Sequence, residues 1–136
     1  MVVWINRHTH TRRKRKKLMK EIGFRYWDPF NEAMIYNYQF QMLSYFFEKY
    51  DEALYGGNNP VLMQFTGLQD ANGRDIYEGD ILTSHMGRLT VIFDYGEFIA
   101  KIEEQPDRWP YIMHARFFPQ VKIVGNIYET AEMEKN

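Results

Sequence analysis

The stretch TGLQDANGRDIYEGDIL, residues 66–82, decides how this chain folds. It places Asn72-Gly73 between two apolar runs, and this dipeptide is a strong signal for a tight turn because both residues tolerate a positive φ. Gly79 marks a second bend, which leads into the apolar run that starts at Ile81. We therefore predict a structural turn motif made of Asp70, Asn72, Gly73, Asp75, Gly79 and Asp80.

Short runs of strand-forming residues lie on both sides of this motif. Before it we predict strands over 20–27, 34–38 and 61–65. After it we predict strands over 81–85, 88–94, 97–103, 111–117 and 121–127, because turn signals recur about every 8–12 residues between apolar alternations. The alternation in 88–94 and 97–103 puts one set of side chains on a shared face: Leu89, Val91, Phe93, Phe98, Ala100 and Ile102.

One segment has the period of a helix instead. Phe40, Leu43, Phe47, Tyr50 and Leu54 recur at spacings of three and four residues, opposite polar positions. Gly56-Gly57 follows, as is typical of a helix C-cap. We therefore expect a mainly β fold, a small barrel-like or curled antiparallel sheet, with an amphipathic helix over about 40–54 that covers an opening or an edge.

The composition limits the class of protein. The chain has 136 residues, which fits one domain over 19–129 with a basic extension over 1–18 and a polar end over 130–136. It has no cysteine, which excludes disulfides, thiolate metal sites and cysteine nucleophiles and fits a cytoplasmic protein. No apolar run approaches the ~18 residues of a membrane helix, so we expect no membrane partner. Aromatic residues make up 17% of the chain, and exposure of some of them would favour a homo-oligomer.

The charge is distributed unevenly. Residues 1–18 hold seven basic residues and no acid, whereas residues 19–136 hold ten basic and eighteen acidic residues, a net charge of −8. The basic block is a candidate nucleic-acid arm that we expect to be disordered: Arg12, Arg13, Lys14, Arg15, Lys16 and Lys17. An acidic body repels phosphates, so nucleic-acid binding would depend on this arm alone. A second hypothesis takes Met19 as the native start, with the codons before it acting as an untranslated leader.

Three motifs resemble the YopX-like family. They are Met19-Lys20-x-Ile22-x-Phe24-Arg25-x-Trp27-Asp28, the run from Met63 to Ile81 that contains the turn motif, and Gly125-Asn126-Ile127-Tyr128-Glu129. The resemblance covers about 19–129 and implies a mainly β, barrel-like fold encoded by phages, prophages or other mobile elements. It implies no established activity and no catalytic residue. Such proteins usually begin at the equivalent of Met19, which favours the native-start hypothesis.

The carboxylates of the turn motif permit an enzyme hypothesis centred on Asp70–Asp80. Turn chemistry explains the same residues, because Asp and Asn side chains bond nearby backbone amides. Counting from Asp70, the sixth position lacks the glycine and the twelfth lacks the glutamate of a calcium loop. His8 with His10, or His85 with His114, would offer too few ligands for a metal. We predict no cofactor, no metal and no catalytic residue.

The remaining candidates are aromatic. Five residues could stack on bases or anchor a protein interface: Trp27, Trp109, Tyr111, Phe117 and Phe118. The acidic body favours the protein interface, and Trp109, in a proline-bounded loop, is the best single candidate. The leading hypothesis is a phage-derived, non-catalytic, self-associating domain that binds a host or phage protein. The alternatives are a nucleic-acid-binding accessory protein and the carboxylate enzyme.

Overall fold

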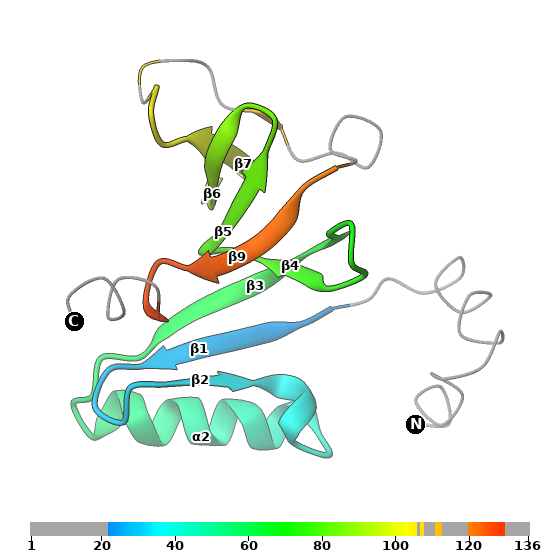
Figure 1. The fold of residues 1–136 in the computed structure, drawn as a ribbon. Coiled ribbons are helices and arrows are strands. Elements are labelled where there is room, and N and C mark those ends of the chain that lie inside the picture. Colours follow the sequence, from blue (N-terminus) through cyan, green and yellow to red (C-terminus); the bar gives the residue numbers. More distant parts are fainter. Residues whose placement is uncertain (1–21, 106, 108–110, 113–119, 130–136) are drawn as a thin grey trace, which may run out of the picture.

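The computed structural model describes residues 22–105, 107, 111–112 and 120–129, and within them the chain forms two antiparallel sheets and an α-helix (Figure 1). The first sheet has four strands in the order β2-β1-β3-β4, and these are β1 (Phe24–Asp28), β2 (Ala33–Tyr36), β3 (Val61–Gln69) and β4 (Asp75–Tyr77). The second has five in the order β8-β7-β6-β5-β9, and these are β5 (Asp80–Ser84), β6 (Gly87–Asp94), β7 (Glu97–Ile102), β8 (Tyr111–Ile112) and β9 (Lys122–Asn126). A 3-10 helix, η2 (Asn37–Gln39), and α2 (Leu43–Tyr55) connect β2 to β3. The prediction of a mainly β, curled antiparallel fold with one helix is confirmed for these residues.

The helix α2 lies along the first sheet, beside β1 and β2 (Figure 1). Its contact with the sheet is aromatic: the ring of Tyr26 on β1 lies 5.5 Å from that of Phe46 and 5.6 Å from that of Tyr50, centroid to centroid. The predicted glycine cap is confirmed, because Gly57 has φ +82° and its N–H donates to the Leu54 carbonyl.

The face that α2 buries is the predicted one only in part, because Phe40, Phe47 and Tyr50 pack against the buried cluster as expected. Phe46 is fully buried, whereas Leu43 and Leu54 are 43% and 45% exposed. The buried side is centred on Phe46, Tyr50 and Ala53, which follow the helical spacing of four and three. Both apolar series have helical period, so periodicity alone could not choose between them.

The second sheet carries the other core. The predicted register of β6 and β7 is confirmed, since Leu89 pairs with Ile102, Val91 with Ala100 and Phe93 with Phe98. The buried cluster that this face forms also includes Ile76 from β4, so β4 contributes its side chain to the core of the neighbouring sheet. The two sheets therefore share hydrophobic contacts as well as the chain.

Several predicted strand bounds were wrong. The first strand begins at Phe24 and ends at Asp28, and the second ends at Tyr36 because the 3-10 helix follows it. β3 extends to Gln69, and β4 was not predicted at all because three residues between turn signals give no visible alternation. Of the strand predicted over 111–117, β8 is Tyr111–Ile112 and the rest lies outside the described residues.

Candidate functional site

The candidate site is the region where the two sheets meet, which we call the joint. It contains Arg25, Asp70, Gly79, Asp80 and Asn126, so all three family-like motifs contribute to it. At one end of it, the Asp70 carboxylate organises the β3–β4 turn. Its Oδ1 accepts hydrogen bonds from the backbone N–H groups of Asn72 and Arg74, both at 2.9 Å. Its Oδ2 accepts the N–H of Ile123 on β9 at 3.0 Å. This one side chain therefore closes the turn and holds the edge strand of the other sheet.

These bonds also set the charge of Asp70. Burial by itself would raise the pKa of the carboxyl, but the three N–H donors from Ile123, Arg74 and Asn72 outweigh it and hold the pKa below its usual range. Gly73 completes the turn with φ +78°, and its N–H donates to the Asp70 carbonyl. The carboxylate is ionised and occupied by the fold.

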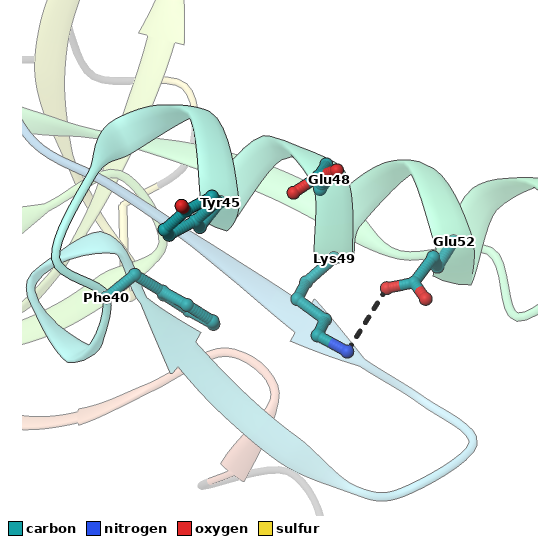
Figure 2. A pocket seen from close by; sticks show the side chains of 5 residues that line it. All are labelled: Phe40, Tyr45, Glu48, Lys49 and Glu52. Carbon is teal, nitrogen blue, oxygen red and sulfur yellow. Dashed lines mark ion pairs between the residues drawn. The ribbon is translucent and has the colours of Figure 1, made fainter.

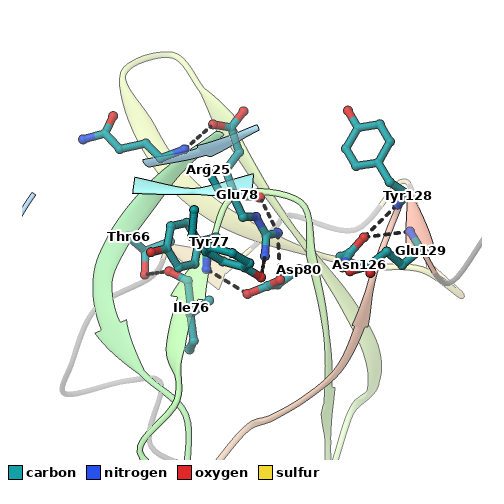
Figure 3. A network of polar contacts seen from close by, with 11 residues as sticks. Arg25, Thr66, Ile76, Tyr77, Glu78, Asp80, Asn126, Tyr128 and Glu129 are labelled. Carbon is teal, nitrogen blue, oxygen red and sulfur yellow. Dashed lines mark hydrogen bonds and ion pairs between the residues drawn. The ribbon is translucent and has the colours of Figure 1, made fainter. Parts of the chain in front are cut away.

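At the centre of the joint lies a buried ion pair between Arg25 on β1 and Asp80 on β5 (Figure 3). The Nη2 of Arg25 donates to Oδ1 of Asp80 at 2.8 Å, and both side chains are 3% exposed. The same Nη2 also donates to the Glu78 carbonyl at 3.1 Å. The second oxygen of Asp80 accepts the N–H of Tyr77 at 2.8 Å. The pair thus fastens β1 to the start of β5.

Two tyrosine rings flank the guanidinium. Its carbon lies 4.8 Å from the ring centre of Tyr77 and 5.8 Å from that of Tyr36, whose hydroxyl also accepts a hydrogen bond from Nη1. Burial raises the pKa of Asp80 and Arg25 only partly offsets it, and burial likewise raises the pKa of the Tyr77 phenol. The Nε of Arg25 has no hydrogen-bond partner within the described part of the chain.

Gly79 is the third fixed point of the joint. Its N–H donates to the Val91 carbonyl at 2.8 Å, and its own carbonyl accepts the N–H of Ile127 at 2.9 Å. Its φ is +91°, and a Cβ built on it would lie 2.9 Å from the sulfur of Met63. Only glycine fits this position without a shift of its neighbours.

The C-terminal motif closes the other side of the joint. Oδ1 of Asn126 accepts the N–H groups of Tyr128 and Glu129 at 3.0 and 2.8 Å, which shapes the turn after β9 (Figure 3). This turn stacks the Tyr128 ring on Trp27, with ring centres 5.7 Å apart. Trp27 is 7% exposed, so it lacks the open ring face that a docking platform needs. The physical reason is that Trp27 lies on the same face of β1 as Arg25, where the Tyr128 ring covers it.

The carboxylates of this arrangement bond to other parts of the fold. Both oxygens of Asp70 and both of Asp80 accept hydrogen bonds from the chain itself. Asp75 accepts a hydrogen bond from Gln69, and Asn72 at the turn is exposed. Among the described residues, no group of three or more His, Asp or Glu side chains is placed to hold a metal ion. Within the described residues, the contacts of Asp70 and Asp80 are therefore structural.

The other predicted contact residues are not described. Trp109, Phe117, Phe118 and the arm 12–17 lie outside the described residues, as does His114, and only the backbone of Tyr111 is described, in β8. They stay predictions. No helix in the described ranges is long and apolar enough to cross a membrane.

Two surface features were not predicted. One is an open hollow of about 540 Å³ beside α2, lined by Phe40, Tyr45, Glu48, Lys49 and Glu52, in which Lys49 pairs with Glu52 at 3.2 Å (Figure 2). The other is the uncovered side of α2 that Leu43 and Leu54 occupy. The sequence carried a signal for the second, because α2 has more apolar residues than one face of a helix can bury.

A family model described as YopX protein matches residues 23–133. Among solved structures, the chain is similar to protein EF1440 from Enterococcus faecalis, with 18% identity and a TM-score of 0.52 over 85% of this chain and 99% of that one. No curated protein matches the chain. The structural likeness concerns the fold.

Proposed function

This chain belongs to the YopX family, and from that premise we propose that it is a non-catalytic protein-binding domain that associates with itself through one side of α2. The observation that carries the proposal is the α2 flank, which we define as Leu43, Phe47 and Leu54. We also propose that the protein is phage-derived and cytoplasmic and that it binds a host or phage protein. The sequence resemblance supports the phage origin, and the absence of cysteine fits the cytoplasm.

The α2 flank is a continuous apolar ridge. Leu43 and Leu54 are eleven positions apart, about three helical turns or roughly 16 Å along the axis, so they lie on one side of the helix. Both are close to half exposed, and Phe47 lies between them half-buried. Single exposed leucines are common, but a row of them that continues a core marks an interaction surface.

A second copy of the chain offers the same ridge. In a two-fold arrangement of antiparallel helices, Leu43 of one copy would face Leu54 of the other, and the contact would be self-complementary. Such pairing buries apolar area on both sides at once, which is the main favourable term in association.

The test is the concentration dependence of the oligomeric state. Sedimentation velocity of the full chain should show a species larger than the monomer, and Leu43→Ser with Leu54→Ser should reduce it to monomer. Val124→Ser is the matched control, because Val124 is 54% exposed on β9, away from α2. A wild-type chain that stays monomeric at its highest soluble concentration would overturn self-association.

A second candidate is the nucleic-acid arm, which the six consecutive basic residues favour. If the arm neutralises about five phosphates, log affinity for duplex DNA should fall with log salt at a slope of roughly −4 to −5. A chain lacking residues 1–18 should lose this binding. The rival hypothesis, that Met19 is the native start, is tested by the intact mass of the protein expressed from its gene with the natural upstream DNA. A mass that corresponds to a chain starting at Met19 or Lys20 would mean that the arm is not part of the protein.

The enzyme alternative has less support, because every oxygen of Asp70 and Asp80 already accepts a hydrogen bond from the chain itself. A metal-assisted version predicts that magnesium, calcium, manganese or zinc raises the melting temperature. The absence of any shift would remove that version.

A further inference from the structure

The tip of the β6–β7 hairpin is built against the usual rules for a hairpin. Its two-residue loop is Tyr95-Gly96, with φ +51° at Tyr95 and +78° at Gly96. Positive φ at both loop positions is the condition of a type I′ turn, for which Asn-Gly is strongly preferred. A tyrosine at the first position is strained, because its Cβ crowds the backbone in the left-handed region.

The tyrosine gains nothing from the fold in return. Its side chain is 96% exposed. Directly below it, Asp94 pairs with Glu97 across the two strands, and like charges in this position destabilise a sheet. Neither carboxylate has an ion pair within the described part of the chain.

The next pair extends an apolar face beyond the core. Phe93 and Phe98 form an edge-to-face contact with ring centres 4.8 Å apart, and Phe93 is 48% exposed. They continue the same face that Val91 and Ala100 bury further down the sheet. Three costs therefore coincide at one tip: a strained tyrosine, a like-charge pair and exposed phenylalanine.

The neighbouring hairpin has no such costs. In the β5–β6 turn, the Ser84 hydroxyl accepts the N–H of Met86 at 3.1 Å and donates to the Gly87 carbonyl at 3.2 Å. That turn is stabilised by its own side chain. Strain that the fold does not need is concentrated at functional sites, so the contrast assigns a role to the β6–β7 tip.

We propose that the β6–β7 tip is a protein-contact surface that inserts the Tyr95 ring into an apolar pocket with a Lys- or Arg-lined rim on a partner protein. The proposal rests on the protein-binding function above and adds a second surface to it. A rigid ring with a polar end is a frequent interface anchor. Asp94 and Glu97 beside the ring set the charge of the rim, since they attract cations and repel phosphates.

A second copy does not supply such a pocket in the hollow beside α2. That hollow has two carboxylates, Glu48 and Glu52, against the one ammonium of Lys49. Its net negative charge would face Asp94 and Glu97. The charges thus favour a different protein as the occupant.

The first test separates contact from stability. Tyr95→Asn creates the preferred Asn-Gly loop and should raise the melting temperature of the full chain by roughly 3–6 °C through relief of strain. Tyr95→Ala keeps the strain of a Cβ at positive φ and should not raise it. A melting temperature lowered by Tyr95→Asn would overturn the proposal, because the ring would then serve the fold.

The second test is photo-cross-linking in the producing cells. Benzoylphenylalanine at position 95 keeps an aromatic ring at the tip, and the linked peptide is identified by mass spectrometry. The expected peptide contains apolar residues with Lys or Arg beside them, and Asp94→Asn with Glu97→Gln should cut its yield about fivefold or more. The same probe at Thr83, an exposed position of β5, is the control.

The outcomes distinguish the two proposals. A cross-link that is equally strong from position 83, that is unaffected by the charge changes, or that is absent would overturn the role of the tip. None of these results affects the oligomeric state of the α2 flank variants. Conversely, loss of the α2 interface without loss of the cross-link would leave the tip in place.

Discussion

The joint between the sheets and the β6–β7 tip use the same kinds of residue with opposite results. In the joint, Asp80 faces Arg25, whereas at the tip Asp94 faces Glu97. In the joint, positive φ falls on Gly79, where no side chain fits, whereas at the tip it falls on Tyr95, which projects into solvent.

The difference lies in how far each region satisfies its own polar groups and its own turns. The joint pairs the buried charges of Arg25 and Asp80 and closes its own turns, and within the described residues the Nε of Arg25 is left without a hydrogen-bond partner. At the tip, Asp94 lies opposite the like-charged Glu97, and the positive φ falls on a tyrosine. In this chain structural contacts account for the longest family-like motif, and the binding surface proposed above is one that breaks local rules.

The largest effect should come from breaking the joint's ion pair. Asp80→Ala would leave the Arg25 guanidinium buried without its counter-charge, and we expect a loss of about 3–5 kcal/mol in the free energy of unfolding, measured by urea titration. Replacing both partners, Arg25→Met with Asp80→Leu, should recover most of this loss. A single variant as stable as the wild type would mean that the pair does not fasten the sheets.

The core under α2 should respond nearly as strongly. Phe46→Ala removes a fully buried ring and should cost about 3–5 kcal/mol. Leu43→Ala, on the exposed flank, should cost less than about 1 kcal/mol in a monomeric sample. Equal losses in urea unfolding would contradict the observed orientation of the helix and restore the one predicted from periodicity.

The two glycines of the turn motif should differ. Gly79→Ala adds strain at φ +91° and places Cβ against the Met63 sulfur, so a loss of about 2–4 kcal/mol is expected. Gly73→Ala adds strain at φ +78°, but no atom lies within 4 Å of the new Cβ, and the loss should be about 1–2 kcal/mol. Thermal melts of the two variants give the comparison, and a reversed order would show that crowding at Gly79 is absorbed by movement of Met63.

The sequence predicts well those structural features that depend on residues close by in the chain. The register of β6 and β7 follows from strict alternation, and the turn at Gly73 follows from the tolerance of glycine for positive φ. The glycine cap of α2 is local in the same way. These features needed no knowledge of the rest of the chain.

What the sequence could not supply are the choices made by packing. Arg25 and Asp80 are 55 positions apart in the sequence, and no pattern in the residues around either one predicts that they pair. The reach of Asp70 to Ile123 spans 53 positions and is equally invisible. The orientation of α2 depends on which aromatic rings of the sheet it packs against. Phe46 is therefore buried, whereas periodicity predicted that Leu43 would be.

The pH dependence of the stability tests whether Asp70 works as part of the joint. In the folded chain the pKa of Asp70 lies below the usual carboxyl range. At a pH between the folded and unfolded pKa values, the unfolded chain therefore binds a proton at Asp70 and the folded chain does not. The stability from this group is therefore present above the ordinary carboxyl pKa of about 4 and is lost as the pH falls through the folded value. Asp70→Asn should lower stability at neutral pH by about 1–3 kcal/mol, because the carboxylate's three N–H partners lose a charged acceptor.

The same substitution should flatten the acid side of the stability profile, measured as urea unfolding at a series of pH values. Asparagine carries no titrating group and has only one acceptor oxygen for the N–H groups of Asn72, Arg74 and Ile123. A carbon-13 titration of the Asp70 carboxyl gives the direct reading. A midpoint at or above the ordinary value would show that the three N–H bonds do not outweigh burial in solution, and the joint would then rest on Arg25, Asp80 and Gly79.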